Sequence, residues 1–191
     1  MLEHIEHIDQ QLFLYLNSLH YSYLDHMMYA LSGKLIWVPL YLAILIYLGI
    51  RDGKKFWIFL LFIILSVLLA DQGSGIIKNL VHRLRPCHEP VLEGLVYTVN
   101  GQCGGQYGFV SSHAANAFNV ALISLLAIRK RWYTIAIIIW ALIVGYTRIY
   151  LGVHYPGDVV CGSLYGTFTG WFCYSLNEQV IRRTQFGKAA A

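Results

Sequence analysis

Charge is scarce in this sequence of 191 residues, where Asp, Glu, Lys and Arg together make up only 13%. That share is about half of what a soluble globular domain carries. Hydrophobic residues reach 57% and aromatic residues 15%. A soluble domain of this size must cover a large surface with polar groups, which this composition does not readily supply. The same numbers exclude intrinsic disorder. We therefore expect one membrane-embedded domain, and the alternative is a soluble enzyme with an oily core.

The sequence also has few cysteines and only a small excess of basic over acidic residues. Four cysteines are too few for a disulfide scaffold, and the absence of CxxC argues against a zinc or redox motif. The opening segment, Met1–Gln11, carries Glu3, Glu6 and Asp9 in place of a basic region, so no cleavable signal peptide is expected. The net charge of +4 comes from short basic clusters between apolar runs. Such clusters indicate membrane topology, and no nucleic-acid partner is expected.

Long hydrophobic runs are what the sequence does contain. Five stand out: Leu35–Ile50, Phe56–Ala70, Ala114–Ile128, Trp132–Thr147 and Val159–Leu176. A membrane span needs about 20 residues, so each run must extend into its flanks. The second can continue through Asp71–Leu80, and the third can begin at Ser111. The runs are apolar all round and do not alternate, which favours helices over strands. The predicted fold is an all-α integral membrane bundle of five transmembrane helices.

Basic residues predict the orientation of this bundle. Nine of the 14 follow the first, third and fifth runs: Arg51, Lys54, Lys55, Arg129, Lys130, Arg131, Arg182, Arg183 and Lys188. The other five lie on the opposite side: Lys34, Lys78, Arg83, Arg85 and Arg148. The positive-inside rule places the nine in the cytoplasm. The second side then faces the periplasm or its equivalent, in a multi-pass protein of the inner (plasma) membrane.

The remaining segments complete the predicted organisation. Residues 1–34 are interpreted as two interfacial helices in the outer headgroup region, and a sixth span with the N-terminus inside is the alternative. Residues 35–177 form the transmembrane domain, with an outer loop at 86–110. Residues 178–191 are expected to be a cytoplasmic tail, and Gly187–Ala191 resemble a frayed end.

Two smaller features concern the outer loop and the last run. Cys87 and Cys103 both lie in the glycine-rich outer loop, where either a disulfide or two free thiols is compatible with the sequence. In the last run, Gly162, Gly166 and Gly170 are spaced by four and form one smooth helix face. Such a face favours close helix packing, and we assign it no chemistry.

Polar side chains gather at the outer ends of the predicted helices. They are Lys78, Arg85, Ser111, Ser112, His113, Arg148, His154 and Asp158. Neighbouring cations repel each other in a low dielectric, and an anionic ligand offsets that cost. Arginine forks and a lysine point charge suit phosphate oxygens. Ser111 is placed to cap the third helix, whose N-terminal N–H groups would also face an anion. The pattern predicts a phosphate site.

Two histidines beside a phosphate indicate catalysis as well as binding. One histidine can attack phosphorus, and the other can protonate the leaving oxygen. A nucleophilic histidine needs an acceptor on its other ring nitrogen. Asp158 follows His154 by four residues with Pro156 between them, and proline favours the first turn of a helix. We therefore predict that Asp158 orients His154, and that His113 acts as the general acid.

These residues resemble the three signature motifs of the type 2 phosphatidic acid phosphatase (PAP2) family, the membrane branch of a superfamily shared with vanadium haloperoxidases. The motif Lys-x6-Arg-Pro corresponds to Lys78, Arg85 and Pro86. The motif Pro-Ser-Gly-His appears as Val110-Ser111-Ser112-His113, and Ser-Arg-x5-His-x3-Asp appears as Thr147, Arg148, His154 and Asp158. With the helix pattern around them, the match extends over about residues 35–176.

The resemblance implies a metal-independent lipid phosphatase without a cofactor. It implies that Lys78, Arg85 and Arg148 hold the phosphate with help from Ser111 and neighbouring amides. It also implies that His154 forms a phosphohistidine, oriented by Asp158, while His113 protonates the leaving group. Three positions depart from the pattern: Val110 replaces Pro, Ser112 replaces Gly and Thr147 replaces Ser. Glycine permits close backbone approach, so Ser112 puts the amide at that position in question.

The expected substrate is a lipid phosphate or diphosphate in the membrane, with undecaprenyl diphosphate as the first preference. Phosphatidylglycerophosphate, phosphatidic acid and lipid A are the alternatives, because nothing in the sequence separates them. Two other classes stay open: a lipid-phosphate-binding membrane protein without turnover, and an ion or metal transporter that uses the eight histidines. Of these histidines, none near the outer site pairs with a second at a metal-ligand spacing, so no metal site is predicted.

Overall fold

The computed structural model describes residues 2–189, with side chains described from Glu3 to Arg183. Over that range it contains seven α-helices, four one-turn 3-10 helices and no strand. The N-terminal part comprises α1 (Leu2–Ser18), α2 (Ser22–Ser32) and η1 (Leu35–Trp37). The rest comprises α3 (Val38–Asp52), α4 (Lys54–Val81), η2 (Pro86–His88), η3 (Pro90–Leu92), η4 (Val99–Gly101), α5 (Ser112–Ile128), α6 (Arg131–Tyr150) and α7 (Pro156–Ala189).

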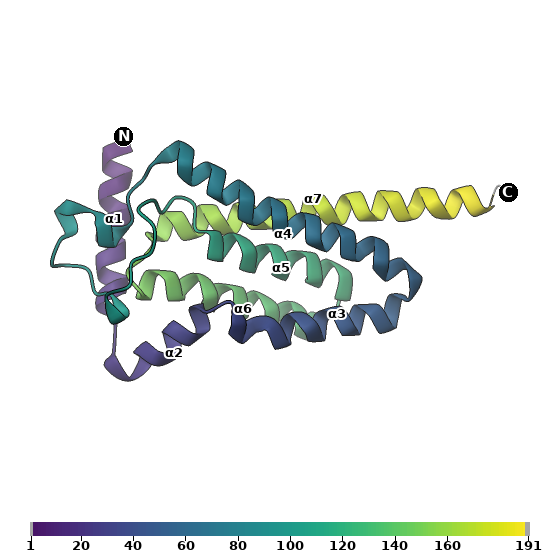
Figure 1. Cartoon of the computed structure of the whole chain (residues 1–191), viewed down its shortest axis with the longest axis horizontal. Helices are drawn as coiled ribbons and strands as arrows, with labels where there is room; N and C mark the ends of the chain where they lie inside the picture. Colours follow the sequence, from purple (N-terminus) through teal and green to yellow (C-terminus); the bar gives the residue numbers. More distant parts are fainter. Residues whose placement is uncertain (1, 190–191) are drawn as a thin grey trace.

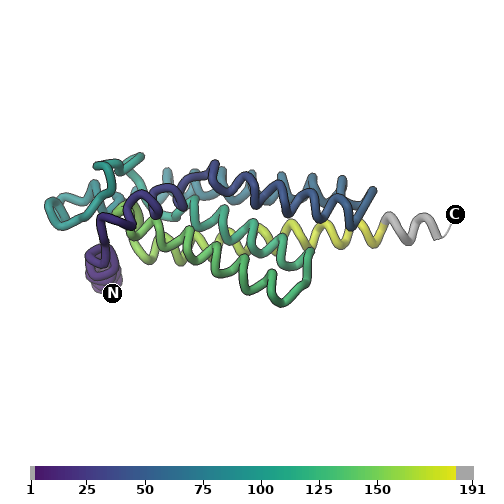
Figure 2. The backbone as a smooth tube through the Cα atoms, turned by 90° about the horizontal axis from the view of Figure 1, so that it is seen from below, coloured from purple at the N-terminus to yellow at the C-terminus, as the bar shows by residue number. Residues whose placement is uncertain are grey.

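Five of these helices, α3 to α7, run side by side along the long axis of the molecule (Figures 1 and 2). They correspond in order to the five apolar runs, so the prediction of an all-α membrane bundle is confirmed. Three segments of the described chain are long and apolar enough to cross a membrane: Leu35–Asp52, Lys54–Val81 and Arg131–Tyr150. The shorter α5 packs against α4, α6 and α7 at the centre of the bundle.

Local signals explain where the helices begin and end. Helix α4 continues through Asp71 to Val81, as predicted, and ends at His82 in the left-handed conformation. Ser111 caps α5 by accepting a hydrogen bond from the Ala114 N–H at 3.4 Å. Helix α7 begins at Pro156, whose missing N–H is no loss in the first turn of a helix. These boundaries place α4, α5 and α7 so that each presents one end to the same region.

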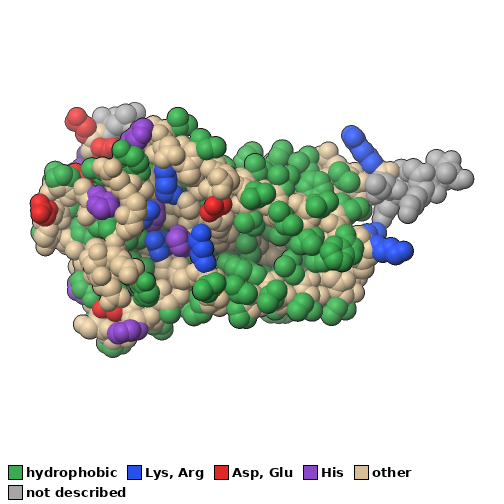
Figure 3. Space-filling model, viewed as in Figure 1, with side chains coloured by type: hydrophobic (Ala, Val, Ile, Leu, Met, Phe, Trp, Pro, Cys, Tyr) green, Lys and Arg blue, Asp and Glu red, His purple; other side chains and the backbone are tan. Residues whose placement is uncertain are grey.

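The outer surface of the bundle carries a broad band of hydrophobic side chains, seen over its middle and right-hand part in Figure 3. Large apolar residues that are exposed there include Trp57, Leu61, Leu68, Ile139, Leu142 and Leu164. Such a contiguous apolar surface would be unfavourable in water. In a bilayer it contacts lipid, which agrees with the low charge of the sequence.

The basic gaps of the sequence meet at one end of the bundle. Arg51 donates to the Ala127 carbonyl at 2.9 Å, and Arg129 donates to the Tyr174 hydroxyl at 2.9 Å. Lys130 lies 5.8 Å from the centre of the Tyr47 ring. The gaps after the first, third and fifth runs therefore lie on the same side, as the count of basic residues predicted.

The two N-terminal helices lie at the opposite end. Figures 1 and 2 show α1 running across the bundle, which fits the interfacial interpretation and not the alternative of a sixth span alongside the others. Asn17 fixes α1 in this position. Its buried side chain donates to the carbonyls of Tyr97, Ile149 and Tyr150 at 3.0–3.1 Å and accepts from the Tyr97 N–H at 2.8 Å.

The segment 178–191, expected to be a cytoplasmic tail, begins as a continuation of the last helix, and its cytoplasmic location stays a prediction. Helix α7 does not stop near residue 177 but continues to Ala189, and residues 190–191 lie outside the described part of the chain. The segment after Leu176 has polar residues with good helix propensity, such as Glu178, Gln179 and Arg182, and no glycine before Gly187. The end of the apolar run therefore indicates where the helix leaves the hydrocarbon layer, and the helix itself continues beyond it.

The glycine face of α7 packs against α5, as predicted. A β-carbon at Gly162 would lie 2.5 Å from the Ser111 carbonyl oxygen, and one at Gly170 would lie 2.9 Å from the Asn119 carbonyl oxygen. A β-carbon at Gly166 would overlap the carbonyl of Ala115. Small residues thus let the two backbones approach closely, which is how membrane helices associate without a hydrophobic driving force.

We predict that Gly166→Ala lowers the thermal stability of the purified protein in detergent. The added methyl group must push α5 and α7 apart, and overpacking of this kind costs about 1–3 kcal/mol. Gly75→Ala in α4 is the matched control, because its β-carbon would meet nothing within 4 Å. A thermal unfolding curve unchanged by Gly166→Ala would contradict the close packing.

Candidate active site

Six segments from distant parts of the sequence meet at the outer end of the bundle. They are the end of α4, the loop at 82–111, the start of α5, the end of α6, the turn at 151–155 and the start of α7. Figure 3 shows Lys, Arg and His side chains gathered where the polar end borders the hydrophobic band. Gly108 lies at the centre of this region. A β-carbon there would be 2.9 Å from Asp158 Oδ2, 3.3 Å from Arg85 Cγ and 3.5 Å from His154 Nδ1, so the packing requires glycine.

His154 and Asp158 form a buried pair. Their side chains are 1% and 0% exposed, and His154 Nδ1 lies 3.3 Å from Asp158 Oδ2. The same carboxylate oxygen accepts from the Tyr155 N–H at 3.1 Å. The spacing of four residues predicted this pair, since the turn places His154 directly before α7 and Asp158 in its first turn. With Nδ1 facing the carboxylate, Nε2 is the ring nitrogen left for chemistry.

Burial lowers the pKa of His154 well below its usual range, and the cations Arg85, Arg148 and Lys78 lower it further. The imidazole is therefore neutral at physiological pH and keeps the lone pair that a nucleophile needs. Burial also lowers the pKa of Arg85. An arginine stays charged over the physiological range even so, because its ordinary pKa is far above it.

Three cations face this pair, and each is held by neutral oxygen atoms. Lys78 donates to the Val110 carbonyl at 2.5 Å and to Ser112 Oγ at 2.6 Å. Arg85 donates to the carbonyls of Tyr107, Cys103 and Val153 at 3.2, 3.3 and 3.5 Å.

Arg148 donates to the Ser32 hydroxyl, and its Nε is buried without a partner among the described residues. None of the three cations forms an ion pair within the described chain. Three converging cations without a carboxylate partner are suited to bind an anion, and their contact with phosphate stays a prediction.

Arg83 also belongs to the site, although the sequence motifs did not indicate it. Unlike the three cations above, it forms ion pairs with carboxylates. Arg83 donates to Asp158 Oδ1 at 2.9 Å and to Asp9 Oδ2 at 2.8 Å. Its guanidinium lies 4.1 Å from the centre of the Tyr155 ring. Asp9 in turn accepts from the Gly157 N–H at 2.8 Å, so α1 is connected to the first turn of α7. Arg83 thereby holds Asp158 from the side opposite His154.

One signal in the sequence could have pointed to Arg83. It precedes Arg85 by two residues, and Leu84 between them forms an isolated bridge with Tyr107. In an extended segment, residues two apart lie on the same face. Arg83 and Arg85 therefore both face the site. Asp9 gave no such signal, because it lies 74 residues before Arg83 in the sequence.

The departures from the family motifs are explained by local contacts. Ser112 is the first residue of α5 and has no positive φ, so its backbone does not require glycine. Its hydroxyl accepts from Lys78 and lies 2.7 Å from Ser74 Oγ. Val110 contributes its carbonyl to Lys78, and Thr147 donates within its own helix to Val144 at 2.7 Å.

The remaining predicted residues lie in two different settings. Ser111 is fully buried as the α5 cap and donates its N–H to the Asp158 carbonyl at 3.0 Å, so direct contact with phosphate stays a prediction. His113 is half-buried in the first turn of α5, and its ring has no hydrogen-bond partner within the described residues. That freedom is what a proton donor to an incoming ligand requires. Among the described residues no cluster of three or more His, Cys, Asp or Glu could hold a metal ion.

Cys87 and Cys103 form a disulfide in the structure, with their Cα atoms 5.9 Å apart. Of the two interpretations open from the sequence, the structure has the bonded one. The bridge closes the outer loop over the residues around Arg85, whose guanidinium is bonded to the Cys103 carbonyl. The other two cysteines, Cys161 and Cys173, are free.

Comparison with known proteins agrees with this geometry. The PAP2 superfamily profile matches residues 55–182. The chain belongs to the PAP2 superfamily. Its membrane helices and its relatives make it a membrane phosphatase of lipid phosphates within that superfamily.

Two curated relatives cover most of the chain. A protein named lipid A 4'-phosphatase from Bacteroides thetaiotaomicron is 43% identical over 97% of this chain and 84% of its own length. A protein of the same name from Porphyromonas gingivalis is 36% identical over 92% of this chain and 75% of its own length. Among solved structures, LpxE of Aquifex aeolicus superposes with a TM-score of 0.66 at 27% identity, covering 86% of this chain and 93% of that one.

We predict that Arg83→Met lowers kcat of this PAP2 phosphatase about 10–100-fold, because a lost hydrogen bond to a charged group costs about 1.5–3 kcal/mol. KM for a small phosphate ester should change little, since Arg83 is engaged by Asp158 and Asp9. Steady-state kinetics on the detergent-purified protein checks this. Arg51→Met, at the other end of the bundle, is the control. A rise in KM at constant kcat would place Arg83 in the phosphate site instead.

Proposed function

We propose that this protein hydrolyses the 4'-phosphate of lipid A or of a closely related acylated sugar phosphate, through a phosphohistidine on His154. The observation that carries the reaction is the buried His154–Asp158 pair facing three cations that lack carboxylate partners. Both curated relatives described above carry the name lipid A 4'-phosphatase, which supports the substrate.

In the first step, Nε2 of His154 attacks the phosphorus atom, and the bond from phosphorus to the sugar oxygen breaks. Lys78, Arg85 and Arg148 bind the equatorial oxygens, whose charge they stabilise in the transition state. Asp158 stabilises the imidazolium that forms when Nε2 becomes bonded to phosphorus. His113 takes up a proton as the anionic phosphate offsets the charge of the surrounding cations, and it donates this proton to the leaving oxygen, so that the sugar departs as a neutral alcohol.

In the second step, a water molecule attacks the phosphohistidine. His113, now neutral, accepts a proton from this water. It thus acts as a base in the second step after acting as an acid in the first. The bond between phosphorus and Nε2 breaks, and inorganic phosphate is released. Each residue returns to its starting protonation state, and the three cations bind the phosphoryl group throughout.

The proposed substrate is one of the alternatives predicted from the sequence and not the first preference given there. Undecaprenyl diphosphate was the first preference there, and lipid A was one of the alternatives. The two relatives with high coverage favour lipid A over the isoprenoid. The phosphate site itself does not distinguish them, because both present a terminal phosphate to the same cations.

The side of the membrane follows from the distribution of charge. The basic residues around Arg51, Arg129 and Lys130 lie at one end of the bundle, and the site lies at the other. By the positive-inside rule, this distribution supports a site at the outer leaflet of the inner membrane, facing the periplasm. A disulfide at the site end fits that compartment, because disulfides persist in oxidising surroundings.

A phosphate-release assay tests this function. The detergent-purified protein with EDTA should release phosphate from lipid A, more slowly from undecaprenyl diphosphate, and His154→Ala should reduce both by at least about 1,000-fold, the order seen when a catalytic nucleophile is removed. His82→Ala is the matched control, since its ring lies on Tyr107 outside the catalytic pair. Activity that survives His154→Ala would refute the mechanism. Release from undecaprenyl diphosphate alone would refute the substrate.

A further inference from the structure

A cavity of about 520 Å³ opens beside the active site and runs into the bundle. At its outer end it is lined by Ser112 and His113, and at its inner end by Ile123 and Ser124 of the same helix. That stretch of α5 is about 18 Å long at about 1.5 Å per residue, close to the ~15 Å depth of one leaflet's hydrocarbon. The cavity therefore joins the catalytic residues to the apolar interior over the depth of a single acyl chain.

Apolar side chains, many of them from α3 and α4, form most of the walls. They include Ile44, Leu48, Phe59, Ile63 and Val67. Such a lining matches a hydrocarbon chain and gives a headgroup nothing to bind.

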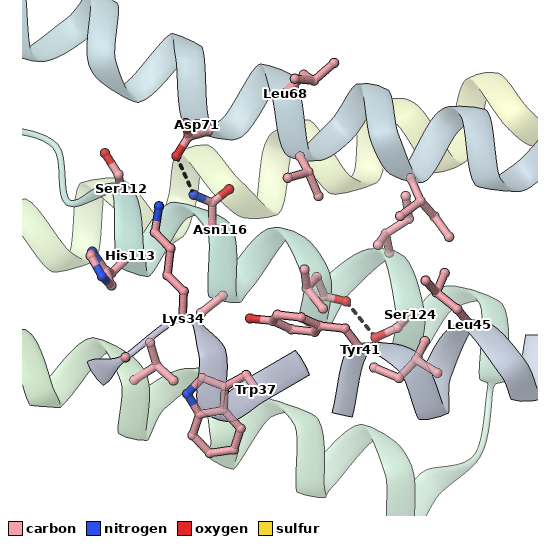
Figure 4. Close-up of a pocket in the computed structure, with 18 of the residues that line it drawn as sticks. Lys34, Trp37, Tyr41, Leu45, Leu68, Asp71, Ser112, His113, Asn116 and Ser124 are labelled. Atoms are coloured by element: carbon pink, nitrogen blue, oxygen red, sulfur yellow. Dashed lines mark hydrogen bonds between the residues drawn. The ribbon is translucent and has the colours of Figure 1, made fainter. Parts of the chain in front are cut away.

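The carboxylate, amide and ammonium groups of the lining lie at the neck of the cavity, one helix turn below the catalytic residues. Asn116 Nδ2 donates to Asp71 Oδ1 at 3.0 Å, and both residues line the cavity. Asp71 forms no ion pair within the described chain, and Asn116 Oδ1 is buried there without a hydrogen-bond partner. Figure 4 shows Lys34 reaching from the other wall toward Asp71 and Asn116. Its ammonium forms no ion pair within the described residues either.

Asp71 and Asn116 are in an unfavourable setting if nothing binds them. A partly buried carboxylate at the edge of an apolar cavity in a bilayer is unfavourable and usually serves function, whereas Lys34 opposite it is exposed. A prenyl chain is pure hydrocarbon and would offer no hydrogen bond to Lys34, to Asn116 Oδ1 or to the second oxygen of Asp71. An ester-linked phospholipid offers acceptors to Lys34 but no donor to Asp71. An amide or hydroxyl group offers a donor to Asp71 and an acceptor to Lys34.

We propose that Asp71, Asn116 and Lys34 form a subsite that binds the amide or hydroxyl group next to the point where an acyl chain joins the substrate's sugar, while the chain fills the cavity below. This inference rests on the proposed phosphatase function and adds what selects the lipid. The occupant is thus an amide-linked or hydroxylated acyl chain of the sugar phosphate. The cavity reaches Ser112 and His113, so a substrate whose acyl chain fills it can also present its phosphate to the three cations.

The test compares three substrates on the full-length protein in detergent. They are an N-acylated, hydroxyacylated glucosamine phosphate, a prenyl phosphate and a small aryl phosphate. Asp71→Leu and Asn116→Leu should lower kcat/KM for the acylated sugar about tenfold or more, the loss expected for one hydrogen bond to a charged group. Neither variant should change kcat/KM for the other two substrates. Asp71→Asn, which keeps a polar pair with Asn116, should show a smaller loss.

The cavity has its own pair of variants. Ile63→Trp fills the cavity and should reduce turnover of the acylated sugar while sparing the aryl phosphate. Leu61→Trp, on the lipid-facing side of the same helix, should reduce neither.

The outcomes separate the two proposals. No release from the acylated sugar by the unmodified protein would refute the proposed substrate and the subsite together. Release from it that is unaffected by Asp71→Leu would refute the subsite alone. An equal loss on all three substrates would show that Asp71 and Asn116 only hold α4 against α5.

Discussion

The repulsion among three cations that share one pocket is the constraint on which this structure depends. Lys78, Arg85 and Arg148 come from the end of α4, the outer loop and the end of α6, and no carboxylate in the described chain pairs with them. Neutral carbonyl and hydroxyl oxygens hold them in place instead. Their full charge is therefore available to a phosphate, whose binding removes the repulsion.

Arg83 makes that arrangement compatible with a catalytic carboxylate. Asp158 would otherwise be attracted toward the three cations and would compete with the substrate. Arg83 engages its Oδ1, and His154 and the Tyr155 N–H engage Oδ2. The N-terminal helix is part of the same network, because Asp9 binds both Arg83 and the first turn of α7. Helix α1, which lies outside the matched family segment, thus supports the active site.

The sequence predicted the parts of this site that depend on local spacing. The pair His154 and Asp158, the cap at Ser111 and the start of α7 at Pro156 each follow from a few neighbouring residues. The long-range parts could not be predicted: Asp9 meets Arg83 only because α1 crosses the bundle end. The contact of Ser112 with Lys78 also depends on the angle between α4 and α5. The full length of α7 also could not be predicted, because an apolar run reports the bilayer and not the length of a helix.

The proposed mechanism depends on one step, the phosphorylation of the neutral, oriented His154. The direct measurement is mass spectrometry of the enzyme quenched in alkali during turnover of an aryl phosphate, a leaving group that needs little help from His113. In the proposed mechanism His113 activates water for the second step, so His113→Ala should increase the phosphorylated fraction. We expect an alkali-stable, acid-labile phosphoryl group on the peptide that contains His154. A phosphoryl group on another residue, or none during active turnover, would contradict it.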